Sequence, residues 1–83
     1  VCTDGVAWFQ AKGKWQSGGS VPTPGTIIFF DWDHDGASDH VGIVESCDGT
    51  TVHTIEGNSG DAVKQNNYTV NSQSILGYGL VAY

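Results

Sequence analysis

The most informative segment of the sequence is Ile27-Ile28-Phe29-Phe30-Asp31-Trp32-Asp33-His34-Asp35-Gly36-Ala37-Ser38-Asp39-His40-Val41-Gly42-Ile43-Val44-Glu45. Two apolar runs flank an acidic loop that contains a glycine, which is typical of two antiparallel strands joined by a loop. The first run is too continuously apolar for a strand at the edge of a sheet, so we expect a central strand.

A third β-rich run, residues 51–56, follows the turn at Asp48-Gly49. His40 lies where the acidic loop gives way to the second strand, and Glu56 and Asn58 lie where the third strand ends. Neighbouring antiparallel strands bring the start of one beside the end of the next. The sequence therefore predicts that an imidazole, a carboxylate and an amide meet at one end of a small sheet.

The rest of the chain predicts one helix and two further strands. Thr3-Asp4 is a suitable N-cap for a helix of about ten residues, which Gly13 can end. Residues 14–25 are rich in Gly, Ser, Pro and Thr and predict an irregular connection that Trp15 pins to the core. Residues 62–70 and 75–83 predict strands. The expected fold is α+β, a small antiparallel sheet that curls toward a half-barrel, with one N-terminal helix.

The length and composition of the sequence limit the number of domains and the classes of partner. Eighty-three residues make one domain at most. The net charge is −6, with only three basic residues, which argues against nucleic acid because phosphate binding needs clustered Lys or Arg. There is no apolar run of about 18 residues, so we expect no membrane partner.

The motif order resembles the CHAP domain family. The matching segments are Pro24-Gly25, Ile27 to Asp31, Asp39 to Val44, and Ile55 to Asn58. CHAP domains are cysteine, histidine-dependent amidohydrolases and peptidases of the NlpC/P60 superfamily, which cut peptidoglycan peptides. The resemblance implies a papain-like fold, cell-wall peptides as substrate, and a secreted location at the bacterial cell wall or in a phage lysin.

The same resemblance implies roles for three residues. In the family, the histidine matching His40 pairs with a nucleophilic cysteine, and the residues matching Glu56 and Asn58 orient or polarise that histidine. Imidazole suits the role because it titrates near neutral pH without help. Either Glu56 or Asn58 could accept the hydrogen bond that fixes its tautomer.

The nucleophile is the point of departure from the family. The resemblance places the family's cysteine in a Trp-Cys segment on a helix upstream of Val1, so we expect residues 1–83 to be the histidine-bearing part of a CHAP domain, and inactive alone. Cys2 is the other candidate, because it precedes a helix and helix N-termini lower thiol pKa values. Cys47 lies near Glu45 and Asp48, which disfavour a thiolate. No cofactor is required for this chemistry.

Two other functions stay open. The first is a non-catalytic, truncated CHAP-like module that binds cell-wall peptide or a partner protein. A sheet without a covering helix would expose an apolar face, which predicts self-association or domain swapping.

The second is a small calcium-binding domain. Asp31, Asp33 and Asp35 alternate before Gly36, and Asp39 falls at the ninth position of a calcium-type loop, although Gly42 stands where a bidentate acid belongs. The alternative is a solvated hairpin loop. Of the other histidines, His34 is predicted to face solvent, and His53 to lie on the sheet face opposite Glu56.

Overall fold

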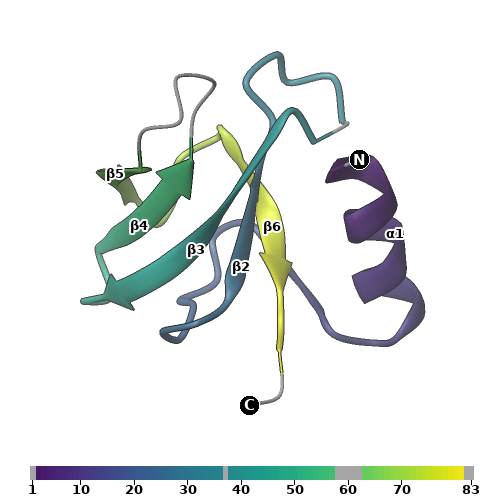
Figure 1. Cartoon of the computed structure of the whole chain (residues 1–83), viewed down its shortest axis with the longest axis horizontal. Helices are drawn as coiled ribbons and strands as arrows, with labels where there is room; N and C mark the ends of the chain where they lie inside the picture. The colour runs from purple at the N-terminus through teal and green to yellow at the C-terminus, as the bar shows by residue number, and fades with distance from the viewer. Residues whose placement is uncertain (1, 37, 58–62, 82–83) are drawn as a thin grey trace.

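The computed structural model describes residues 2–36, 38–57 and 63–81 (Figure 1). Within them the chain is α+β, with one short helix and an open sheet of six antiparallel strands in the order β1-β6-β2-β3-β4-β5. The elements are α1 (Cys2–Ala11), β1 (Trp15–Ser17), β2 (Ile27–Phe30), β3 (His40–Cys47), β4 (Thr51–Gly57), β5 (Val63–Thr69) and β6 (Ile75–Gly79).

The sheet confirms the strands that the central stretch predicts. β2 lies between β6 and β3, with Ile27 opposite Ile43 and Phe30 opposite His40. β2 is therefore central, as its continuous apolar run indicates. The predicted irregular connection differs in one part, because residues 15–17 form the edge strand β1 beside β6. A strand of three residues without alternating polarity is too short to be predicted from the sequence pattern.

The helix α1 has the predicted length and end, but a different start. It begins at Cys2, so the predicted cap Thr3-Asp4 lies inside its first turn. The first turn also suits short polar residues, since its N–H groups have no partners within the helix. Gly13 has a φ of 70° and Lys14 N donates to Phe9 O at 2.9 Å, which ends the helix.

The core lies on one face of the sheet, where side chains of β2, β3, β4 and β6 meet. Its fully buried members include Ile28, Phe30, Val44, Val52 and Tyr78. On the other face the ring of Phe29 packs against Phe9 and Trp15, with centroids 5.9 Å and 5.6 Å apart.

Gly77 and Gly79 of β6 allow this close approach. A Cβ atom at either position would collide with the ring of Trp15 or of Phe9, respectively. β3 and β5 leave apolar side chains exposed on the same face as Phe29, namely Val41, Ile43 and Val63. Self-association through this face stays a prediction.

Candidate active site

His40 opens β3, and Glu56 stands near the end of β4. Ile43 pairs with Ile55, so the preceding Gly42 faces Glu56 across the two strands. A Cβ atom at Gly42 would lie 2.8 Å from Glu56 Cγ. The glycine therefore gives the Glu56 side chain room to reach His40, two residues earlier on the same face of β3.

The imidazole and the carboxylate are in direct contact. His40 Nε2 lies 2.8 Å from Glu56 Oε1, with 28% of the His40 side chain and 7% of the Glu56 side chain exposed. An ionised carboxylate only accepts hydrogen bonds, so Nε2 carries the hydrogen. In the neutral ring Nδ1 is then the nitrogen with a free lone pair, and it can take a proton.

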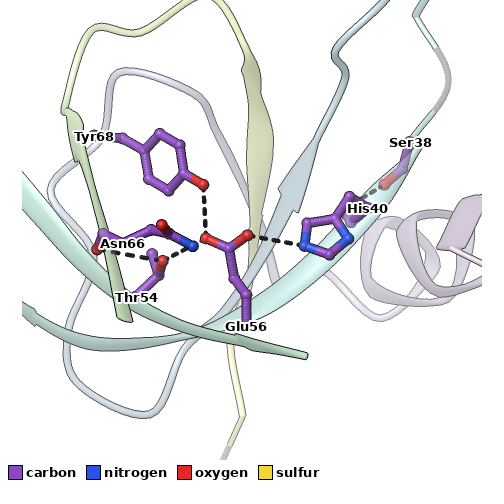
Figure 2. A network of polar contacts seen from close by, with 6 residues as sticks. All are labelled: Ser38, His40, Thr54, Glu56, Asn66 and Tyr68. Carbon is purple, nitrogen blue, oxygen red and sulfur yellow. Dashed lines mark hydrogen bonds and ion pairs between the residues drawn. The ribbon is translucent and has the colours of Figure 1, made fainter. Parts of the chain in front are cut away.

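Two hydroxyl groups bind the other oxygen of the carboxylate. Thr54 Oγ1 donates to Glu56 Oε2 at 2.6 Å, and Tyr68 OH donates to the same atom at 2.7 Å (Figure 2). Thr54 Oγ1 also lies 3.5 Å from Asn66 O, but the single hydroxyl hydrogen favours the much shorter contact. Glu56 is thus held at both oxygens.

These contacts set the charge state of the site. Burial alone would raise the pKa of Glu56, but hydrogen bonds from Thr54, Tyr68, His40 and Asn66 outweigh it and lower that pKa below 4.5. Burial, with the hydrogen bond to Glu56 and its charge, raises the pKa of Tyr68 far above 10. At neutral pH Glu56 is ionised and Tyr68 keeps its hydroxyl hydrogen.

Aromatic rings form one wall of the site. The His40 ring stacks against Phe30 and Trp32 with centroids 5.7 Å and 6.1 Å apart, and Trp32 stacks on Phe30 at 4.7 Å. Trp32 is 43% exposed. It therefore covers the buried Phe30 and presents aromatic surface to solvent next to His40.

The two cysteines lie in different places. Cys47 is a free cysteine and the last residue of β3, so it stands about 23 Å along the strand from His40. Cys2 is the first residue of α1. Figure 1 shows the N-terminal end of α1 beside the loop that enters β3, and Figure 2 shows the same purple helix next to Ser38 and His40.

A comparison with known protein families matches residues 2–58 to the CHAP domain. This segment is more than half of the chain and contains Cys2, His40 and Glu56. The chain belongs to the CHAP family. Searches among curated proteins and among solved structures found no match.

Membership in the CHAP family supports a general assignment of function. CHAP domains act typically on the bacterial cell wall, so this CHAP domain is related in function to peptidoglycan hydrolases. In the part of the chain that the structure describes, no helix has the length and apolar character needed to cross a membrane.

Asn58, the other predicted partner of His40, lies outside the residues that the structure describes. Glu56 makes the contact with His40 that was predicted for either Glu56 or Asn58.

The sequence analysis did not predict the contributions of Thr54, Tyr68 and Trp32 to the site. Thr54 could have been found, because it lies two residues before Glu56 on the same face of one strand. Tyr68 could not, because its place depends on the pairing of β4 with β5.

In the acidic loop of this CHAP domain, carboxylates accept hydrogen bonds from backbone N–H groups of the same loop. Asp31 is buried and accepts hydrogen bonds from the backbone N–H groups of Asp35 at 3.2 Å and Gly36 at 2.8 Å. Asp39 Oδ2 accepts from Asp33 N at 3.2 Å. Asp31 and Asp39 therefore have a structural role, because their carboxylates accept hydrogen bonds from N–H groups of the loop.

The predicted calcium ligands are only partly brought together. Asp31, Asp35 and Asp39 each offer an oxygen within 4.8 Å of the others, whereas Asp33 is not part of this group. Calcium binding stays a prediction. The other histidines lie as expected: His34 is exposed, and His53 Nδ1 pairs with Asn67 Oδ1 on the face opposite Glu56.

A hollow of about 300 Å³ lies at the opposite end of α1 from the loop that enters β3. Side chains near the end of the helix and of the last strand line it, namely Trp8, Phe9, Lys14, Leu80 and Val81. It contains none of the residues that surround His40.

Proposed function

We propose that this CHAP domain is a cysteine-dependent amidase or endopeptidase that cleaves peptides of the bacterial cell wall, with His40 as its general base. The observation that carries the proposal is the 2.8 Å pair between His40 Nε2 and Glu56 Oε1. The pair leaves Nδ1 as the proton acceptor, beside an aromatic wall that is partly open to solvent.

The reaction proceeds in two stages. His40 Nδ1 takes the thiol proton, and the thiolate attacks the carbonyl carbon of the peptide. The tetrahedral intermediate collapses as the imidazolium returns the proton to the departing amine, which leaves a thioester. A water molecule, activated by the neutral imidazole, then hydrolyses the thioester and restores the thiol. Glu56 stabilises the imidazolium in both stages.

We propose Cys2 as the nucleophile, in place of the upstream cysteine expected from the resemblance. Cys2 lies within the segment that matches the family, residues 2–58, and in the first turn of α1. A helix N-terminus stabilises a thiolate by its dipole and its free N–H groups. In Figure 1 the N-terminal end of α1 lies near the loop that leads to His40, whereas Cys47 is the last residue of β3.

The test is release of muropeptides from purified peptidoglycan under reducing conditions, followed by mass spectrometry. Wild type and the matched control Cys47→Ser are expected to cleave, while Cys2→Ser and His40→Ala are expected to be inactive. Cleavage by Cys2→Ser would exclude Cys2 as the nucleophile.

A folded wild type that sediments with peptidoglycan but releases nothing would overturn the enzymatic proposal. That result would favour the non-catalytic binding module. Folding is checked by circular dichroism, so that inactivity is not mistaken for unfolding.

A further inference from the structure

We propose that Tyr68 and Thr54 are positioning residues, which hold the Glu56 carboxylate so that His40 keeps a single tautomer. The inference rests on the proposed function. It concerns the oxygen of Glu56 that does not touch His40, and Tyr68 lies outside the residues 2–58 that match the family.

The two hydroxyl groups converge on one atom. Thr54 Oγ1 and Tyr68 OH lie 2.6 Å and 2.7 Å from Glu56 Oε2, while His40 Nε2 lies 2.8 Å from Oε1. Thr54 is fully buried and Glu56 is 6% exposed, so water has little access to the carboxylate. Hydrogen bonds to an ionised group are among the stronger ones in proteins.

A glutamate needs such support to orient an imidazole. Its terminal torsion is broad and its two oxygens are chemically equivalent, so an unsupported carboxylate rotates readily. With Oε2 fixed by two donors, Oε1 points at His40 Nε2. This arrangement keeps the hydrogen on Nε2 and leaves Nδ1 free, which is the orienting role of the third group in a catalytic triad.

Tyr68 is itself held in place. Its ring packs against Phe30 with centroids 4.8 Å apart and against Trp32 at 6.1 Å. β5 pairs with β4 along its whole length and sets Tyr68 opposite Val52. The edge strand β5 thus positions the Tyr68 hydroxyl group next to Glu56, and the Tyr68 ring also forms part of the aromatic wall beside His40.

The first test is Tyr68→Phe, which removes the hydroxyl but keeps the ring. We expect kcat on peptidoglycan fragments to fall about tenfold with KM unchanged, the size of effect that losing one hydrogen bond to a charged group gives. Tyr78→Phe is the matched control, because Tyr78 OH is buried without a hydrogen-bond partner among the described residues. It is expected to keep the wild-type kcat.

A second readout needs no substrate. Nitrogen chemical shifts of the histidine rings report the tautomer, and a His40→Gln spectrum assigns the signals. Wild type is expected to show one His40 tautomer with hydrogen on Nε2, and Tyr68→Phe a mixture of both. This measurement separates the two proposals, since it succeeds or fails even if the wild type does not cleave peptidoglycan.

Thr54 supplies a rescue experiment if Tyr68→Phe fails to fold. Thr54→Val removes the hydroxyl at nearly constant volume, and Thr54→Ser restores it. The valine variant is expected to show the mixed tautomers and lower kcat, and the serine variant to recover both. A single unchanged tautomer in Tyr68→Phe or Thr54→Val would overturn the inference and leave these residues a purely structural role.

Discussion

His40 Nε2 lies 2.8 Å from Glu56 Oε1, although 16 residues separate them in sequence. Because the strands are antiparallel, the start of β3 and the end of β4 fall at one end of the sheet. Gly42 leaves room for the glutamate side chain to cross between them. One strand pairing and one glycine thus place an imidazole beside a buried carboxylate.

Glu56→Gln is expected to impair both activity and stability. The amide nitrogen of glutamine would face at least one of three donors, from His40, Thr54 and Tyr68, and could not accept their hydrogens. We expect a loss of about 1–3 kcal/mol in the free energy of unfolding, measured with urea, and loss of peptidoglycan cleavage.

Glu45→Gln is the control for that change. Glu45 is exposed, and its carboxylate accepts a hydrogen bond from Gln65 Nε2 at 3.1 Å. It should stay near the wild type in both measurements. Equal stability of Glu56→Gln and wild type would show that the network around Glu56 contributes nothing to folding.

The stability of the fold should fall in acid. The folded pKa of Glu56 is lowered below its ordinary value of 4.5, so its contribution is fully present above pH 4.5 and is lost as the pH falls through the folded pKa. Asp31 adds to this effect. Burial would raise its pKa, but hydrogen bonds from Gly36 and Asp35 lower it. Urea midpoints measured from pH 7 to pH 3 test the sign.

Comparing the stability of wild type with that of Glu56→Gln at each pH isolates the contribution of the Glu56 carboxylate. The difference in stability between wild type and this variant should shrink as the pH falls, because protonation also removes the charge of Glu56. A difference that stays constant from pH 7 to pH 3 would contradict a lowered pKa of Glu56.

Tyr78→Phe should leave stability unchanged or raise it. The Tyr78 side chain is fully buried, and its hydroxyl has no partner within the described part of the chain. Burial, with the nearby Cys47, raises the pKa of Tyr78 to about 12. An unpaired buried hydroxyl costs about 1–3 kcal/mol of desolvation, so its removal relieves that cost. A clear loss of stability on urea unfolding would show that the hydroxyl has a partner, such as water.

The sequence reveals most of this arrangement, and the exceptions have physical causes. Ile27 to Glu45 predicts two strands and their loop because apolar residues, acids and glycine occur in separate runs. The contact between His40 and Glu56 could be predicted because both stand at strand ends, whereas their catalytic roles were implied only by the resemblance to CHAP domains. The contact of Tyr68 with Glu56 could not be predicted, because a polar edge strand has no alternation of apolar residues that would fix its register.

The calcium prediction can be tested on the acidic loop. Asp31, Asp35 and Asp39 bring oxygens within 4.8 Å of one another, and a divalent cation would offset their repulsion. Millimolar Ca²⁺ is then expected to raise the melting temperature of wild type more than that of Asp35→Asn. Mg²⁺ is the control ion, because it demands a smaller octahedral site. Equal melting curves with and without Ca²⁺ would remove the calcium hypothesis.

The exposed face of β3 should drive self-association. Val41 and Ile43 project from this face with 38% and 47% of their surface exposed, and Val63 of β5 is 73% exposed on the same side. Burying such surface between two copies removes apolar area from water. Sedimentation velocity is therefore expected to show dimers that grow with protein concentration, and Ile43→Lys should reduce them. Val21→Lys is the matched control, because Val21 is 56% exposed but lies in the loop before β2, outside the sheet. A clean monomer at high concentration would show that three exposed side chains are too few to hold two copies together.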